Sequence, residues 1–81
     1  MNFSERLYTE RKKNNLSAEE LAKACEVSRS YVTLMENGKR LPGAKLLPRL
    51  AGALNLRTTT ILDWYLEELR TKMQKDLQIE A

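Results

Sequence analysis

The sequence predicts an all-α fold, a compact domain of four to five helices with an extended C-terminal helix. Apolar residues recur at helical spacing in short blocks, and capping residues or helix breakers separate these blocks. The 81 residues contain only 3 Gly and 2 Pro, and no segment alternates as a strand would. Hydrophobic residues at 42% and charged residues at 31% favour a folded chain over a disordered one.

The first predicted helix covers residues 3–13 and ends at Asn14. Phe3, Leu7 and Arg11 follow one another by one turn on the same face. A capping box then marks the start of a helix over residues 18–25, in which a side chain and a backbone amide cap each other reciprocally. Its two residues are Ser17 and Glu20, and the buried stripe behind them is Leu21, Ala22 and Cys25.

Ser28 is predicted to cap a third helix that runs to about Glu36, with Val32 and Met35 facing inward. The pair Asn37–Gly38 ends it. A basic loop over residues 39–44 follows.

Pro48 fits the first turn of a fourth helix, where its missing amide costs nothing. The core face of that helix is Leu47, Leu50, Ala51 and Leu54. The last helix is expected from about Thr60 to Asp76, with a cap among residues 58–60.

Composition argues against several classes of function. The chain has one cysteine, Cys25, and no His, so we expect no internal disulfide, no metal site and no cofactor. No catalytic residues are predicted, because the serines have no evident base. The N-terminus is too charged for a signal peptide and no apolar run could span a membrane, which favours a cytoplasmic protein.

Charge is distributed unevenly along the chain. Residues 1–57 carry 11 Lys and Arg against 6 Asp and Glu, whereas residues 58–81 carry 3 against 5. A basic excess of this size is by itself compatible with a solvated surface. The net acidic character of residues 58–81 predicts that they point away from any nucleic acid.

Two short helices joined by the three residues 25–27 have the spacing of a helix-turn-helix. Ala22 stands where the two helices cross, a place that only a small side chain can occupy. A general two-helix hairpin is the alternative reading of this pattern.

The stretches LSAEELAKACEVSRSYVTLMENGKR and LLPRLAGALNL resemble the Cro and lambdoid-repressor family of XRE-type helix-turn-helix regulators over about residues 3–66. The resemblance implies a lambda-repressor-like DNA-binding domain in residues 1–66. It also implies that Arg11 pairs with Glu36 and ties the first helix to the recognition helix.

Two positions depart from the family pattern. Glu26 stands in the turn where a left-handed glycine is common, which costs about 1 kcal/mol. Ala18 replaces a frequent glutamine, so phosphate contacts beside Ser17 would come from backbone amides at the helix N-terminus.

The N-terminal residues of a recognition helix reach the base edges of the major groove. We therefore expect base contacts from Ser28, Arg29, Ser30, Thr33 and Leu34. Arg29 is suited to a bidentate contact with guanine or, alternatively, to a phosphate. The Thr33 methyl or Leu34 suits a thymine methyl, although Leu34 could instead pack within the protein.

Residues around and beyond the recognition helix are expected to bind phosphates of double-stranded DNA. These residues are Ser17, Tyr31, Asn37, Lys39 and Arg40. For Tyr31 the alternative is that it covers the helix junction.

The final segment, residues 60–81, is predicted to form a homodimer that binds a pseudo-palindromic operator. Its apolar stripe continues past the end of the related domain and consists of Leu62, Leu66, Leu69 and Met73. The alternative is that this stripe packs on the monomer's own core.

The sequence thus predicts a DNA-binding regulator, most simply a repressor, and no enzyme. An antitoxin, or a protein-interaction module built on a helix-turn-helix, is the competing function. Glu19 and Glu20 could present an acidic surface to RNA polymerase, and an antagonist protein is a further conceivable partner.

Overall fold

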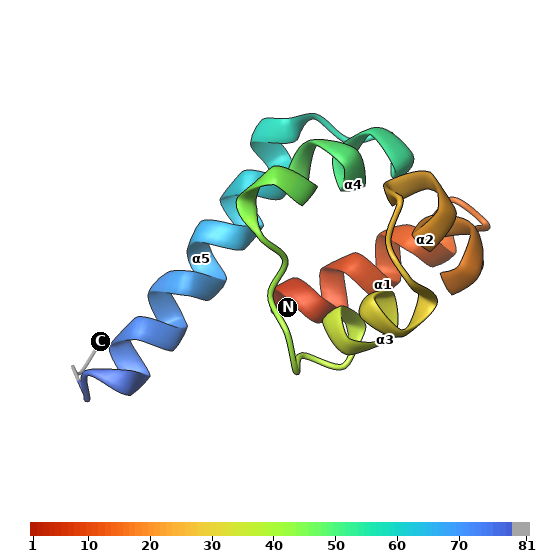
Figure 1. The fold of residues 1–81 in the computed structure, drawn as a ribbon. Helices are drawn as coiled ribbons and strands as arrows, with labels where there is room; N and C mark the ends of the chain where they lie inside the picture. The colour runs from red at the N-terminus through yellow and green to blue at the C-terminus, as the bar shows by residue number, and fades with distance from the viewer. Residues whose placement is uncertain (79–81) are drawn as a thin grey trace.

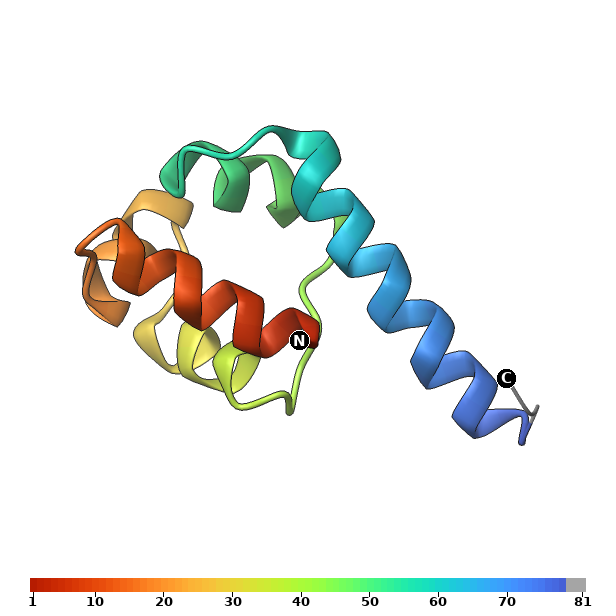
Figure 2. The same cartoon turned by 180° about the vertical axis from the view of Figure 1, so that it is seen from behind.

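The computed structural model describes residues 1–78, and these residues form helices without strands (Figure 1). Helices α1 to α4 build one body, and both views show the far half of α5 projecting from it (Figures 1 and 2). The projecting helix accounts for the long dimension of a molecule that measures 39 × 24 × 22 Å. The elements are α1 (Phe3–Lys13), α2 (Ala18–Cys25), α3 (Arg29–Glu36), the 3₁₀ turn η1 (Ala44–Leu46), α4 (Leu47–Ala53) and α5 (Thr58–Asp76).

One apolar core lies between the helices of the body and the start of α5. Every helix contributes to it, and the predicted inward faces of α2, α3 and α4 are all buried. Its members are Phe3, Leu7, Leu21, Ala22, Cys25, Val32, Met35, Leu47, Leu50, Ala51, Leu54 and Ile61. The helical periodicity therefore identified the core correctly for the four helices of the body.

Side-chain caps fix where the helices begin. The Ser17 hydroxyl accepts a hydrogen bond from the Glu20 amide at 3.0 Å, and the Glu20 carboxylate accepts from the Ser17 amide at 2.9 Å. This is the capping box that the sequence predicted. Asn2 and Glu5 form a second box at the start of α1, which the sequence analysis missed.

Left-handed residues end the four helices of the body. Asn15, Glu26, Gly38 and Asn55 all have φ between 56° and 73°. Glu26 has φ 58° and ψ 41°, and the Val27 amide that follows donates back to the Ala22 carbonyl at 3.0 Å. The turn thus keeps the geometry that favours glycine, although it contains a glutamate.

Helix α5 begins earlier than predicted. Thr58 is its first residue and Arg57 occupies the N-cap position without a side-chain cap, so none of the three threonines caps it. The first half of α5 packs on the body: Ile61 is buried, and the Tyr65 ring meets Phe3 edge-on with 6.1 Å between ring centres.

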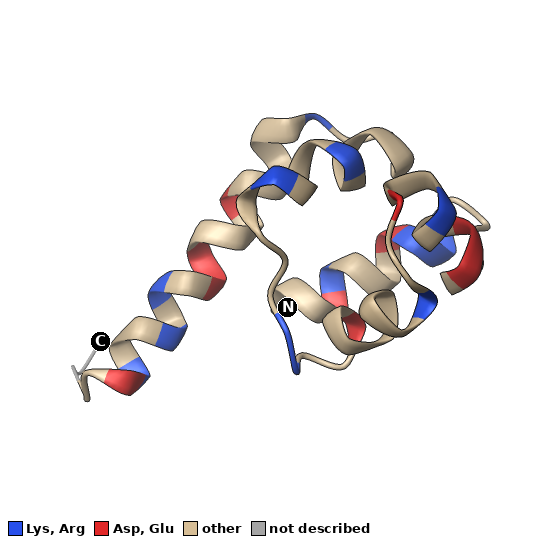
Figure 3. Ribbon diagram, in the orientation of Figure 1, with Lys and Arg blue, Asp and Glu red and all other residues tan. Residues whose placement is uncertain are grey.

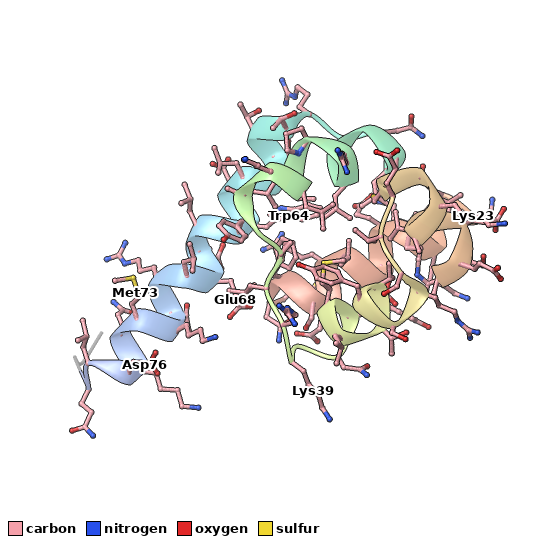
Figure 4. All side chains as sticks on the ribbon, viewed as in Figure 1. Lys23, Lys39, Trp64, Glu68, Met73 and Asp76 are labelled. Atoms are coloured by element: carbon pink, nitrogen blue, oxygen red, sulfur yellow. The ribbon has the colours of Figure 1, made fainter. Side chains whose placement is uncertain are left out.

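Further along α5, the Glu68 carboxylate accepts a hydrogen bond from the Phe3 amide at 3.0 Å. The predicted apolar stripe lies largely outside this contact. Leu62, Leu66 and Met73 are exposed and Leu69 is half-buried. Met73 projects from the side of α5 that faces away from the body, whereas Glu68 lies toward it (Figure 4).

Within residues 1–78, no helix combines the length and the apolar character that crossing a membrane requires.

The strained turn leads to a test. Glu26→Gly should raise the free energy of unfolding by up to about 1 kcal/mol, because glycine adopts positive φ without steric cost. Glu26→Ala is the matched control: it also removes the exposed contact with Arg49 at 3.4 Å but keeps a Cβ in the left-handed region. Urea unfolding measures both. A glycine variant no more stable than the alanine variant would contradict the role given to this turn.

Candidate nucleic-acid interface

Helix α3 is held in the body by one face only. Val32 and Met35 are fully buried, and Ala22 of α2 is buried beside them. The small Ala22 side chain allows the two helices to approach closely. The opposite face of α3 is left in solvent.

Four residues of that outer face line one shallow depression, and all four are exposed: Arg29, Ser30, Thr33 and Leu34. The Thr33 hydroxyl donates to the Arg29 carbonyl at 3.2 Å, which leaves its methyl group as the unoccupied part of the side chain. Leu34 is 36% exposed. The structure therefore gathers four of the five predicted base-reading residues on one face.

The fifth, Ser28, stands at the N-terminus of α3. Its hydroxyl oxygen accepts from the Tyr31 amide at 3.1 Å, just as the Ser17 hydroxyl accepts from Glu20 at the start of α2. Both serines are exposed. Because each hydroxyl uses only its oxygen in the cap, its proton remains available for an external acceptor such as a phosphate.

An ion pair anchors the last turn of α3. Arg11 donates to both carboxylate oxygens of Glu36, through Nε at 2.6 Å and Nη2 at 2.9 Å, and through Nη1 to the Leu16 carbonyl at 2.8 Å. Both side chains are about nine-tenths buried. The hydrogen bonds to Glu36 raise the pKa of Arg11, although burial opposes this. The predicted pair is thus present, as a bidentate bridge between α1 and α3.

The loop after α3 carries two exposed cations. Gly38, with φ 73°, reverses the chain after the exposed Asn37, and Lys39 and Arg40 follow. The Arg40 guanidinium lies over the Tyr31 ring, 5.5 Å from its centre.

Tyr31 itself is half-buried against the core. It covers the helix junction, one of its two predicted roles, and it also positions Arg40.

Figure 3 shows basic residues near both ends of α3 and acidic residues at the start of α2. The latter are Glu19 and Glu20, both exposed. The pKa of Glu20 is lowered chiefly by the hydrogen bond from the Ser17 backbone amide. Its carboxylate is therefore already engaged as a cap.

Neither a metal centre nor a reactive thiol is found in residues 1–78. No group of three or more metal-ligating side chains occurs there. Cys25 is buried, and burial raises the pKa of its thiol.

A groove of about 310 Å³ lies beside the loop that follows α3. Lys39 and Arg40 line one side, and Lys72 and Lys75 of α5 line another. The sequence analysis missed the two α5 lysines. More than thirty residues separate them from the loop, and no sequence signal placed them beside it.

Comparison with known proteins agrees with this geometry. A family model described as helix-turn-helix matches residues 7–61. The "ImmF control region 10 kDa protein" of Bacillus phage phi105 is 46% identical over 46 residues, which are 57% of this chain. The match spans about half (51%) of that relative's length.

Solved structures with a similar fold are regulators. SinR, a master regulator for biofilm formation crystallised in complex with DNA, matches with a TM-score of 0.68 and 26% identity over 74% of this chain and 97% of its own. The clp gene regulator ClgR of Corynebacterium glutamicum gives a TM-score of 0.70 and 25% identity over 94% and 82%. A complex of SinR protein with SinI protein gives 0.69 and 26% over 94% and 75%.

The buried ion pair predicts a strongly non-additive mutant cycle. Arg11→Met should cost about 3 kcal/mol of stability, because it leaves the buried Glu36 carboxylate unpaired. Adding Glu36→Leu should recover most of this loss, since the pair is then replaced by apolar side chains. Lys13→Met, which breaks an exposed pair with Glu10 at 3.5 Å, is the control and should cost less than about 1 kcal/mol. Urea unfolding of each variant checks the cycle, and purely additive losses would rule out this role for the pair.

Proposed function

Because this chain belongs to the helix-turn-helix family, of the type found in Cro and lambdoid phage repressors, we propose that it is a DNA-binding transcriptional regulator that reads the major groove as a homodimer. The observation that carries the proposal is the two-sided α3. One face is locked in the core, and the other presents Arg29, Ser30, Thr33 and Leu34 to solvent. Likeness to a DNA-bound regulator supports the same conclusion.

Base reading is assigned to the first turns of α3. Arg29 carries the donors for a bidentate contact with guanine O6 and N7. Ser30 is a weaker discriminator, because a hydroxyl both donates and accepts. The free methyl of Thr33 and the exposed Leu34 suit a thymine methyl group.

Phosphate binding is assigned to residues that flank α3. Lys39 and Arg40 supply charge, while Asn37 and the hydroxyls of Ser17 and Ser28 supply neutral polar groups. Tyr31 contributes through Arg40, whose guanidinium it supports. Such contacts set affinity and docking orientation without reading sequence.

Residues 1–66 are proposed as the DNA-binding domain and residues 60–81 as the dimerisation segment, of which 79–81 lie outside the described residues. Leu62, Leu66 and Met73 form an exposed apolar stripe on α5. Ile61, Trp64, Tyr65 and Glu68, the residues that face the body, lie on another side of the helix. The monomer's own core therefore leaves the stripe uncovered, which favours a second copy as its partner.

Repression is the favoured sign of regulation. A dimer on a pseudo-palindromic operator blocks access of other proteins to that DNA, and the likeness to a phage control-region protein supports this role. An antagonist protein is a second class of partner, which the likeness to the SinR–SinI complex supports.

Specificity and affinity should separate by mutation. Arg29→Ala should cost about 1–3 kcal/mol of preference for a selected operator over random duplex. Lys39→Ala should weaken both DNAs alike and reduce the salt slope by about 0.9. Lys23→Ala removes the same charge far from Lys39 (Figure 4) and should change neither quantity. Competition titrations at several salt concentrations measure both, and an unchanged operator preference for Arg29→Ala would defeat the base-reading assignment.

Dimerisation is tested on two adjacent residues of α5. Met73→Glu places a charge in the apolar stripe and should shift the protein to monomer, more strongly when combined with Leu66→Glu. Gln74→Glu adds the same charge one position outside the stripe and should remain dimeric. Sedimentation equilibrium reads the state, and circular dichroism checks that the helices persist. A wild-type chain that is monomeric both free and on DNA would refute the dimer.

A further inference from the structure

We propose that Lys72 and Lys75 of α5 bind the DNA backbone together with Lys39 and Arg40, so that the groove between α5 and the loop after α3 holds one phosphate strand. The inference rests on the proposed function and extends its DNA-binding surface onto α5. It replaces the expectation from net charge that this segment points away from DNA.

The geometry brings together cations that are distant in the sequence. Lys39 and Arg40 leave the end of α3, while Lys72 and Lys75 are three residues apart and share one face of α5. All four line the same groove of about 310 Å³. Thr71 lines it too and adds a hydroxyl donor.

The charges of this groove are not balanced within the molecule. Glu68 is the one carboxylate among its lining residues, and one of its oxygens accepts from the Phe3 amide. Among residues 1–78, the ion pairs are those of Arg11, Lys13 and Arg49, so none of the four groove cations is paired there. Four cations facing one carboxylate create a local positive potential that attracts an anion.

Two observations favour a phosphate strand over an acidic peptide as the occupant. The apolar floor residues Phe3 and Met35 are only 2% and 0% exposed, so an amphipathic peptide would find little apolar surface there. The groove is also continuous with the proposed DNA surface, because Lys39 and Arg40 belong to both. A backbone strand that contacts this loop therefore runs beside Lys72 and Lys75.

The proposed dimer leaves this groove open. Met73 projects away from the body, whereas Lys72 and Lys75 line a groove that α5 shares with the body (Figure 4). One helix can thus contact a second copy on one side and DNA on another.

The test is the salt dependence of binding to a random-sequence duplex of about 30 base pairs, long enough for two half-sites one turn apart. Lys72→Gln/Lys75→Gln should lower the slope of log affinity against log salt by about 1.8, or 0.9 per contact. At 0.1 M salt this slope corresponds to a loss of about eightfold in affinity per contact. Glutamine keeps the helix propensity of lysine.

Arg70→Gln is the matched control, since it removes one charge from the same helix but does not line the groove. It should leave the slope unchanged, and sedimentation checks that every variant keeps the wild-type oligomeric state. An unchanged slope in the double variant, or an equal loss per charge in Arg70→Gln, overturns the proposal. A double variant that binds DNA normally but no longer binds a polyglutamate peptide that the wild type binds also overturns it, in favour of a protein partner. Wild-type protein that binds no duplex would instead defeat the proposed function itself.

Discussion

The bidentate bridge between Arg11 and Glu36 is the contact on which the presentation of α3 depends. Eight residues are too few for a helix to be stable alone, and the outer face of α3 cannot contribute to packing because it is left for a ligand. Val32 and Met35 hold its inner face, and the bridge holds its last turn. A buried ion pair adds little net stability compared with apolar side chains, but its two parallel hydrogen bonds fix direction. The bridge therefore sets the angle at which α3 meets a partner more than it stabilises the fold.

Helix α5 serves three different surroundings along its length. Its first turns complete the core through Ile61, and Glu68 ties its middle to the start of α1. Its outer stripe stays apolar and exposed, while Lys72 and Lys75 face the loop after α3. Dimer contact and DNA contact are thereby placed on different sides of one rigid element. A change in how two copies pair would consequently alter where the cations of α5 meet the DNA.

Local rules predicted most of the fold. Capping at Ser17 and Ser28 and the periodic core fixed the first four helices closely, because each signal acts within one or two turns. Helix α5 was misplaced at its start, since three consecutive threonines offered equivalent caps and the structure uses none. The pair between Arg11 and Glu36 came from resemblance, because two charges 25 residues apart carry no pairing signal of their own.

The candidate site was only partly predictable for the same reason. The outer face of α3 follows from the positions of Val32 and Met35, which periodicity identifies. The location of Lys72 and Lys75 follows instead from the angle at which α5 leaves the body, and a sum of charges over the segment concealed it. The central claim, that two copies of α3 read DNA, is tested most directly by selecting bound sites from a random duplex pool. The account predicts enrichment of a pseudo-palindrome whose half-sites are centred about 10 base pairs apart, and bound DNA without any enriched sequence would contradict it.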